Sequence, residues 1–307
     1  MDVTALAGGV GGAKLLVGLD RVLTERGTLT AVVNTGDDAT IYGTHVSPDV
    51  DIVTYWLSGL ADTERGWGIS GDTFTVVDAM QTLGVDAWFR LGDRDLATCM
   101  HRTQRLEDGA RLTQITMEIA TALGVKPRIL PMSDDPVRTK VESVDGRQLD
   151  FQEYFVRERC EPEVSAISFD GLDTAKPTSE VLSSLAGADA IVICPSNPLL
   201  SIGPILALPG VAEILRQHPR VIAVSPIVNG RALKGPADRL LSRLAGEASA
   251  SQVARLYASF CNTFVLDESD PDELPKVEGL EIKAVATDTI MKDHIASERL
   301  ARAVLEL

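Results

Sequence analysis

The stretch that decides the fold runs from residue 2 to residue 38, DVTALAGGVGGAKLLVGLDRVLTERGTLTAVVNTGDD. An apolar strand over 2–7 meets glycines and then a helix near 12–25, and a second strand follows over 29–34. A strand that breaks into glycines before a helix places bare backbone N–H groups and a positive helix end at the carboxyl edge of a sheet. This order predicts an α/β protein that handles a nucleotide or another phosphate.

The glycine run, Gly8-Gly9-Val10-Gly11-Gly12-Ala13-Lys14, fits neither of the two best-known phosphate-binding patterns. Ala13 separates Gly12 from Lys14, and Leu15 stands where the P-loop has a hydroxyl group. The dinucleotide pattern fails as well, because Lys14 fills the position of its third glycine. A tight turn without a ligand is the simpler interpretation. Four glycines followed by a lysine nevertheless favour close approach of the backbone to an anion.

Composition limits the class of protein. With 307 residues, 45% of them hydrophobic and 24% charged, the chain is typical of a globular protein with a sizeable core. The net charge of −15 argues against a nucleic-acid partner, which needs a basic footprint. The four cysteines lie far apart, which favours reduced thiols. We find neither a leader pattern nor an apolar run of about 20 residues, so we expect a cytoplasmic protein without a membrane partner.

Strands and helices alternate at both ends of the chain, and helical periodicity dominates between them. Further strands are expected near 127–131, 137–144, 164–169, 190–194, 220–225, 262–266 and 281–285. Further helices are expected near 49–60, 72–83, 93–107, 112–123, 151–159, 178–186, 209–217, 236–245, 250–259 and 291–306. The pattern predicts a Rossmann-like, doubly wound, mostly parallel sheet with a helical insertion over the carboxyl edge of its strands. We predict one domain, with a core of 1–48 and 126–307 and a mainly helical insertion over 49–125.

Carboxylates gather after the second strand and before the next helix. Asp37 and Asp38 end the first group, and Asp49 and Asp51 lie at the predicted helix start. Asp49 is equally well explained as a simple helix cap, and Asp51 in the first turn favours the helix dipole. Hard carboxylate oxygens suit magnesium, which takes one or two protein carboxylates together with phosphate oxygens of the substrate. We therefore predict that Asp37, Asp38 and Asp51 are metal ligands.

Other polar segments add to this edge of the sheet. Two apolar strands empty into the loops 195–204 and 225–236, which are rich in Ser, Asn, Gly and Pro. Open α/β sheets bind ligands at the carboxyl ends of their strands, so these loops and the glycine run predict a composite pocket. Arg90, Arg94 and Arg102, in and around the segment Leu91–Asp95, supply positive charge in an acidic chain, although a solvated helix face also explains them. The polar loop 131–136 is equally well explained as a turn.

The motifs, in their order along the chain, resemble the 2-phospho-L-lactate transferase family. They are Gly8–Lys14, Asn34–Asp38, Ser47–Asp51, Leu91–Asp95, Pro195–Pro198 and Ser225–Val228. The resemblance implies transfer of a phosphorylated three-carbon acid from its guanosine diphosphate ester to the terminal ribityl hydroxyl of the deazaflavin FO. GMP is released, and the product belongs to coenzyme F420 biosynthesis. The resemblance also implies a magnesium-dependent homodimer.

The resemblance carries roles over to individual residues. Asp51 and Arg90 are implied as FO ligands, and Asp51 and Asp38 are the catalytic candidates. Three roles stay open for Asp51: metal ligand, general base or hydrogen-bond partner of FO. The nucleotide-binding candidates are Gly9, Gly11, Gly12, Lys14, Asn34, Ser196, Asn197, Ser201, Ser225 and Asn229. Asn229 stands where many family members have a second glycine, which leaves the shape of its loop open. We expect Asp51→Asn to abolish transfer. We expect it to leave the fold intact, because a helix start tolerates Asn.

The three-carbon acid stays open among phospholactate, phosphoenolpyruvate and phosphoglycerate. The Gly-Val-Gly-Gly-Ala start and residues 65–68 look more like bacterial family members, which favours the enolpyruvyl donor. A nucleotide-sugar-binding regulatory protein of the related gluconeogenesis-factor family is the main alternative, but we expect it to lack Leu91–Asp95 and Ser47–Asp51. A nicotinamide-dependent dehydrogenase would need the third glycine and a ribose-binding carboxylate.

Overall fold

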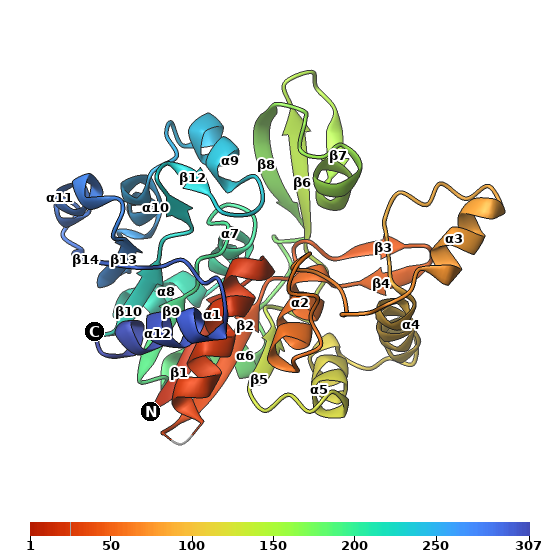
Figure 1. The fold of residues 1–307 in the computed structure, drawn as a ribbon, viewed down its shortest axis with the longest axis horizontal. Helices are drawn as coiled ribbons and strands as arrows, with labels where there is room; N and C mark the ends of the chain where they lie inside the picture. The colour runs from red at the N-terminus through yellow and green to blue at the C-terminus, as the bar shows by residue number, and fades with distance from the viewer. Residues whose placement is uncertain (25) are drawn as a thin grey trace.

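Seven parallel strands form the central sheet of the computed structural model, which describes residues 1–24 and 26–307 (Figure 1). The order across the sheet is β14-β13-β10-β9-β1-β2-β5, and every neighbouring pair is parallel. The strands are β1 (Asp2–Ala7), β2 (Thr28–Val33), β5 (Arg128–Pro131), β9 (Ala190–Ile193), β10 (Val221–Val224), β13 (Thr263–Asp267) and β14 (Lys283–Thr287). The predicted doubly wound α/β fold is confirmed.

The direction in which strands are added to the sheet reverses between β1 and β9. From β1 the chain adds β2 and β5 on one side, and it later adds β9, β10, β13 and β14 on the other. The loops that follow β1 and β9 therefore diverge, and such a switch point is where open α/β sheets bind ligands. Leu6 pairs with Ile193, and Ala7 pairs with Val33. The loops after these three strands consequently leave the sheet at the same level.

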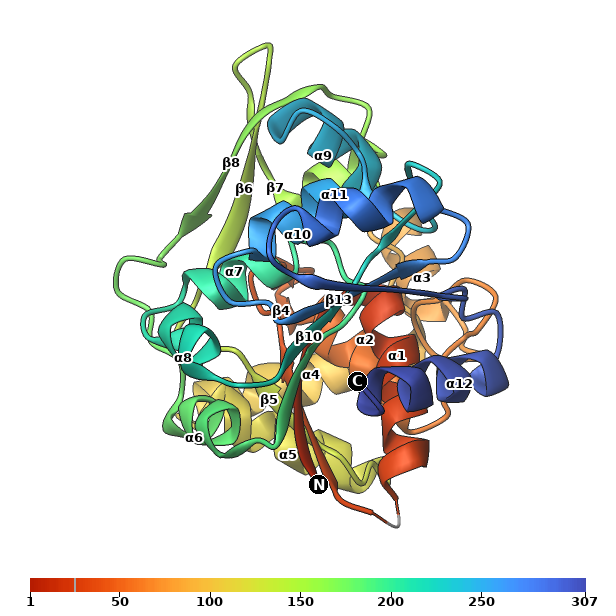
Figure 2. The same cartoon turned by 90° about the vertical axis from the view of Figure 1, so that its left-hand side faces the viewer.

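Helices cover both faces of the sheet (Figure 2). One face carries α1 (Gly9–Leu23), α2 (Pro48–Leu57), α5 (Leu112–Ala122) and α12 (His294–Leu305). The other carries α6 (Ser179–Gly187), α7 (Ile202–Ala207), α8 (Val211–Gln217), α10 (Ala250–Tyr257) and α11 (Leu274–Glu278). Successive strand side chains point to opposite faces, so Val3, Ala5 and Ala7 of β1 pack toward α1 while Leu6 packs toward α7 and α8. Each face thus has its own apolar core.

Smaller sheets extend from the central one. β6 (Arg138–Ser143), β7 (Gln148–Asp150) and β8 (Val164–Asp170) form an antiparallel sheet that rises beyond the carboxyl edge (Figure 1). The strand predicted at 164–169 is therefore present but lies outside the parallel sheet. The hairpins β3–β4 (Ala39–Ile41, Thr44–Val46) and β11–β12 (Ile227–Val228, Arg231–Ala232) were not predicted. Their strands are too short to show a periodicity.

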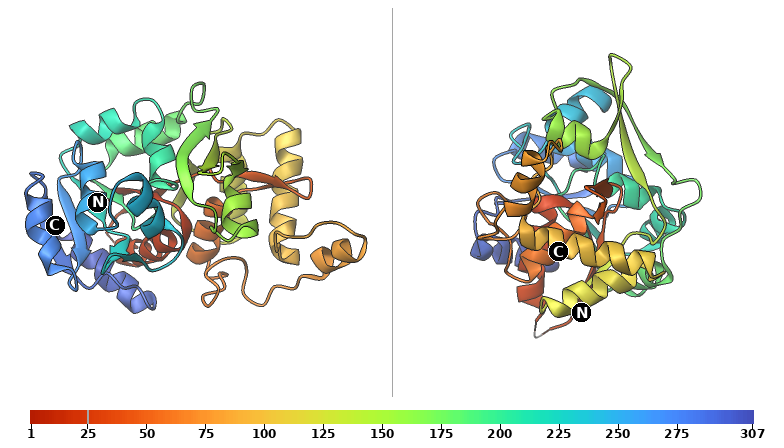
Figure 3. Two further views of the ribbon diagram at one scale, coloured as in Figure 1. Left: turned by 90° about the horizontal axis from the view of Figure 1, so that it is seen from above. Right: turned by 90° about the vertical axis from the view of Figure 1, so that its right-hand side faces the viewer.

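The insertion lies at the β5 end of the molecule, opposite β14, as the view from above shows (Figure 3). Besides α2 and α5 it contains α3 (Thr75–Thr82) and α4 (Asp93–Glu107), the latter with the predicted bounds. A small core of its own joins α4 to the β3–β4 hairpin, and it includes Val46, Leu96 and Cys99. The start of α2 reaches back over the end of β1, which brings the insertion to the switch point.

Other predicted elements differ in their bounds. The helix expected near 12–25 begins at Gly9, and residue 25 lies outside the described residues. The segment 151–159 contains a π-helix over Glu153–Arg157, and α9 spans Ala237–Leu244. A 3₁₀ turn over Pro271–Glu273 precedes α11. Within 1–24 and 26–307, no helix has the length and apolarity required to cross a membrane. All four cysteines are buried free thiols, as predicted.

The close contact of α1 and α12 depends on Gly18. A Cβ atom at this position would clash with the carbonyl group of Ser297 in α12. We expect Gly18→Ala to lower the free energy of unfolding by about 1–3 kcal/mol, because α12 would have to move. Gly187→Ala is the matched control, since a Cβ at Gly187 in α6 meets no atom within 4 Å. Urea unfolding measures both variants, and an equal effect of the two would contradict this account.

Candidate functional site

Asp49, at the start of α2, holds the switch point together. Its carboxylate accepts hydrogen bonds from the Gly9 N–H group at 2.7 Å and from Asn34 Nδ2 at 3.0 Å. Burial raises the pKa of Asp49 to about 6, although both hydrogen bonds favour the charged form. The N-terminus of a helix attracts anions, and here a carboxylate of the same chain takes the N–H group of Gly9. One of the free backbone N–H groups in the first turn of α1 thus has a hydrogen-bond acceptor within the protein.

The glycine run is the first turn of α1 and packs tightly against other parts of the protein. A Cβ at Gly8 would lie 2.7 Å from Ser201 Cβ and would clash with Asp49. A Cβ at Gly11 would clash with the carbonyl oxygen of Pro195. The run was predicted as a loop that approaches an anion. Contacts within the protein already require these glycines, so their number alone does not indicate a ligand.

The loop after β9 is fastened to the same turn. Ser196 Oγ accepts a hydrogen bond from the N–H of Gly8 at 3.1 Å and donates one to its carbonyl oxygen at 2.8 Å. A Cβ at Gly12 would lie 2.6 Å from this hydroxyl. Asn197 Oδ1 accepts from the N–H groups of Leu199 and Leu200, which shapes the loop. The structure therefore brings Ser196 and Ser201 to the glycine run, and it gives Ser196 and Asn197 structural hydrogen bonds.

The predicted metal ligands after β2 lie in two environments. Both carboxylate oxygens of Asp38 are engaged, by His45 Nε2 at 2.8 Å and by Ser47 Oγ at 2.7 Å. Asp37 is buried, and its Oδ1 atom has no hydrogen-bond partner among the described residues. Burial raises the pKa of Asp37 well above its ordinary value, and the charge of Asp49 adds to the shift. Asp37 therefore keeps an oxygen that an ion could use, whereas Asp38 does not.

Asp51 forms a buried ion pair with Arg102 of α4. Arg102 is 1% exposed, its Nη1 atom lies 3.1 Å from Asp51 Oδ2, and its Nη2 atom bonds to Oδ1. Burial lowers the pKa of Arg102, but the Asp51 carboxylate outweighs burial and raises it. Burial also raises the pKa of Asp51, against the charge and hydrogen bonds of Arg102, and the two contacts between the groups are those of a bidentate ion pair. The sequence-based expectation that Asp51→Asn leaves the fold intact stays a prediction, and the ion pair argues against it, because the substitution leaves a buried guanidinium group without its counterion.

Asp95 and Cys99 lie beside this ion pair. Tyr55 Oη donates to Asp95 Oδ1 at 2.8 Å, and ligand atoms of Asp51, Asp95 and Cys99 lie within 4.8 Å of one another. Burial raises the pKa of Asp95 to about 7, and the charge of Asp51 adds to the shift. The predicted set Asp37, Asp38 and Asp51 does not form such a group within the described ranges.

The segment Leu91–Asp95 helps to cap the starts of α3 and α4. Asp93 accepts hydrogen bonds from backbone N–H groups at the start of α3, and Asp72 accepts from those at the start of α4. The Thr73 hydroxyl, followed by these N–H groups, lowers the pKa of Asp93 to about 2. Asp93, at the start of α4, thus caps α3, and Asp72, which precedes α3, caps α4.

Arg90 precedes this pair of caps and lies on the surface. Its Nη1 atom lies 2.6 Å from Asp78 Oδ1, and its guanidinium group lies 4.7 Å from the centre of the Phe74 ring. The side chain is 42% exposed, so the planar group stays accessible to a ligand. Its predicted role toward FO stays a prediction.

Ser225 and Asn229 shape the loop after β10. Ser225 Oγ bonds to both backbone groups of Ile227. Asn229 has a φ of 51°, and Gly230 has a φ of 72°, which is the conformation of a two-residue hairpin turn between β11 and β12. Asn tolerates the left-handed region, so the departure from a second glycine leaves a regular hairpin.

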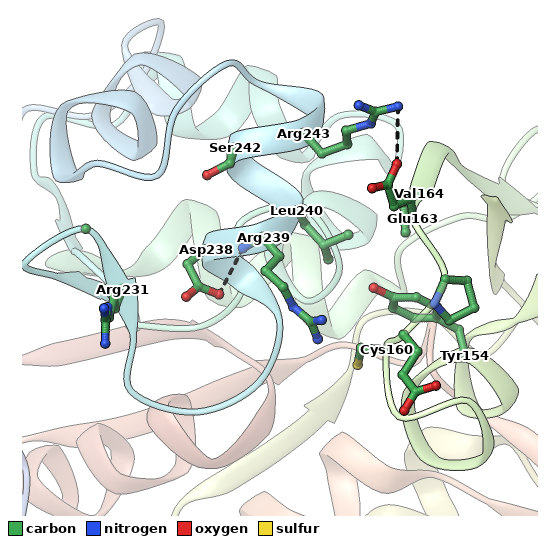
Figure 4. A pocket seen from close by; sticks show the side chains of 13 residues that line it. Tyr154, Cys160, Glu163, Val164, Arg231, Asp238, Arg239, Leu240, Ser242 and Arg243 are labelled. Carbon is green, nitrogen blue, oxygen red and sulfur yellow. Dashed lines mark hydrogen bonds and ion pairs between the residues drawn. The ribbon is translucent and has the colours of Figure 1, made fainter. Parts of the chain in front are cut away.

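A cavity of about 500 Å³ opens beside this hairpin (Figure 4). Tyr154 and Cys160 line one side, and Arg231, Arg239 and Arg243 line the other. Figure 4 shows Arg243 directed toward Glu163 at the rim, at a distance of 3.9 Å. The lining contains none of the site residues predicted from the sequence. The predicted centre at the switch point is therefore separate from this cavity.

Fold and site together define a Rossmann-like α/β protein with a buried polar centre at the switch point of its sheet. The family model described as "2-phospho-L-lactate transferase CofD" matches residues 3–303. The chain belongs to this family, and the predicted class of enzyme, a transferase, is confirmed by the family and its named members.

Two relatives cover nearly the whole chain. The 2-phospho-L-lactate transferase of Methanosarcina mazei is 40% identical over 300 residues, which is 98% of each chain. The phosphoenolpyruvate transferase of Kitasatospora aureofaciens is 40% identical over 313 aligned positions, covering 100% of this chain and 98% of the other. Among solved structures, a UPF0052 family protein from Bacillus halodurans has a TM-score of 0.67 at 17% identity, covering 99% of this chain and 98% of that one. This last likeness shows the fold alone.

Sequence reasoning missed several members of the centre. Asp49 was noted but not separated from a simple cap, Arg102 was noted only as a source of positive charge, and neither Tyr55 nor Asp95 was selected as a site residue. One signal was present. Asp95, Cys99 and Arg102 stand at i, i+4 and i+7 of the predicted helix 93–107 and therefore share one face.

We predict that Asp51→Asn lowers the free energy of unfolding by about 3 kcal/mol, because breaking a buried ion pair leaves an uncompensated charge. The double variant Asp51→Asn/Arg102→Met should recover most of this loss, since Met fills the space without a charge. Urea unfolding of both variants and of Arg102→Met completes a double-mutant cycle. Strictly additive effects in this cycle would contradict the ion pair.

Proposed function

We propose that this protein transfers a phosphorylated three-carbon acid from its guanosine diphosphate ester to the terminal ribityl hydroxyl of FO, releasing GMP, in coenzyme F420 biosynthesis. The observation that carries the proposal is the buried carboxylate centre at the switch point, in a chain whose family and relatives are transferases of such acids. A cytoplasmic homodimer is part of the proposal.

The reaction exchanges one phosphorus–oxygen bond for another. The FO hydroxyl oxygen attacks the phosphorus that bears the three-carbon acid, the bond to GMP breaks, and the hydroxyl proton passes to a base or to solvent. Catalysis of this kind depends on positioning and on stabilising charge on phosphate oxygens. Because Arg102 bonds to both carboxylate oxygens of Asp51, we assign Asp51 to positioning FO rather than to proton abstraction.

Magnesium is the proposed metal, and the donor set fits it at one carboxylate. The unpartnered, buried Oδ1 atom of Asp37 is a hard oxygen of the kind that magnesium prefers. Asp38 and Asp51 have their oxygens engaged by His45, Ser47 and Arg102. Asp37 is therefore the residue that would hold the ion. A bound magnesium ion would neutralise charge on the phosphate oxygens of the donor.

The comparisons do not distinguish which three-carbon acid the donor carries. Relatives named for 2-phospho-L-lactate and for phosphoenolpyruvate are equally similar, at 40% identity. We keep phosphoenolpyruvate as the proposed acid, on the likeness of residues 65–68 to bacterial members.

A mass-spectrometric assay tests the reaction and names the donor together. The purified protein is incubated with magnesium, FO and each of the three guanosine diphosphate esters separately. We expect GMP and one phosphorylated FO adduct, with the enolpyruvyl ester as the best donor. Formation of no adduct from any ester, together with binding of a sugar nucleotide, would favour the regulatory alternative.

We predict that Arg90→Ala raises the KM for FO about tenfold and leaves kcat nearly unchanged, because the guanidinium group offers charge and a stacking plane at the surface. Steady-state rates at saturating donor measure both constants. Arg128→Ala is the control, since Arg128 is the exposed first residue of β5 and therefore lies at the amino ends of the strands, away from the carboxyl edge. An unchanged KM for FO in Arg90→Ala would remove Arg90 from the acceptor site.

A further inference from the structure

Two lysines from distant parts of the chain approach the first turns of α1. Lys14, on α1, donates from its Nζ atom to the carbonyl oxygen of Met291 at 2.8 Å, and this atom lies 5.6 Å from the centre of the Trp56 ring. Lys234, in the loop after β12, donates to the carbonyl oxygen of Arg65 at 3.1 Å. Each ammonium group thus contacts a backbone carbonyl.

The same small region joins these contacts. Trp56 Nε1 donates to the carbonyl oxygen of Gly66 at 3.2 Å, which places Gly66 beside the ring that Lys14 overlies. A Cβ at Gly66 would lie 2.6 Å from Lys234 Nζ and 3.1 Å from a methyl carbon of Val10. Val10 belongs to the glycine run. The end of α2, the loop before α3 and the loop after β12 therefore converge on the start of α1.

The two ammonium groups are uncompensated. No carboxylate forms an ion pair with Lys14 or Lys234 in the part of the chain that the structure describes. Burial, followed by the charge of Lys234, lowers the pKa of Lys14, so the two groups repel each other. A chain with a net charge of −15 has many carboxylates for this purpose, yet none is placed here. An anion between the lysines would relieve the repulsion.

Arg65, whose carbonyl oxygen accepts the hydrogen bond from Lys234, adds no unpaired positive charge to this region. Its Nε atom bonds to Asp62 Oδ2 at 2.8 Å, and its guanidinium group lies 5.0 Å from the centre of the Trp67 ring. The Arg65 guanidinium group is therefore compensated by Asp62.

We propose that Lys14 and Lys234 form a cation pair that binds the diphosphate of a nucleoside diphosphate ligand. The proposal rests on the proposed function and adds Lys234 as a binding residue of the donor. Asp49 takes the N–H group of Gly9, so the start of α1 meets less of the phosphate charge than its glycines suggest. Each lysine has three donor hydrogens and uses one in the contacts above, which leaves donors for phosphate oxygens.

Calorimetric titration of the full-length protein with GDP, with inorganic pyrophosphate and with guanosine tests the pair. Lys234→Gln and Lys14→Gln are each expected to weaken GDP binding about tenfold, the effect of losing one charge-assisted contact. Pyrophosphate binding should weaken in parallel, and guanosine binding should not change. Lys234→Arg should retain most of the affinity for GDP. Lys283→Gln is the control. Lys283 is the exposed first residue of β14 and lies at the amino ends of the strands, away from the carboxyl edge.

Three results would overturn the proposal. These are GDP affinity of Lys234→Gln within twofold of the wild type, equal weakening of guanosine and GDP, and absence of GDP binding by the wild-type protein. The first would exclude the contact, and the second would show that the loop has only changed shape. The transfer assay separates this proposal from the proposed function. Loss of GDP affinity in Lys234→Gln without transfer from any ester supports the cation pair alone, whereas normal transfer by this variant removes Lys234 alone.

Discussion

The hydrogen bonds of the Asp49 carboxylate fix three segments relative to one another: the start of α1, the end of β2 and the start of α2. A buried carboxylate is costly unless donors replace its lost water, and Gly9 and Asn34 supply them. The side chain fits only because Gly8 has no Cβ. The switch point, the glycine run and the entry to the insertion therefore take their positions from one interaction.

Charge is divided around this point. Carboxylates of the loop after β2 and of α2 are buried near Asp49, where Arg102 compensates Asp51 and Asp37 keeps an unpartnered oxygen. Lys234 lies close to Val10 beside Gly66, and Lys14 lies over the Trp56 ring. Buried carboxylates and uncompensated lysines are thus both present around the switch point.

Much of the fold could be predicted from sequence, because long elements carry a clear period. The predicted bounds of α4 agree with the structure, and all seven strands of the central sheet were expected. Strands of two or three residues have no readable period, so both hairpins were missed. In the site, Asp37 and Asp51 stood out through their motifs. Arg102 and Lys234 did not, because their partners are contacts across the fold, such as the 51 residues that separate Arg102 from Asp51.

The ion pair between α2 and α4 also bears on how this family can change. It joins the start of α2, which contacts the core through Asp49, to α4 through two buried charges that exclude water. Either residue alone would be a buried charge without a partner, so a change at one position requires a change at the other. Because Asp49 lies in the same first turn of α2 as Asp51, such a double change would also act on the switch point. In alignments, positions 51 and 102 should vary as a pair.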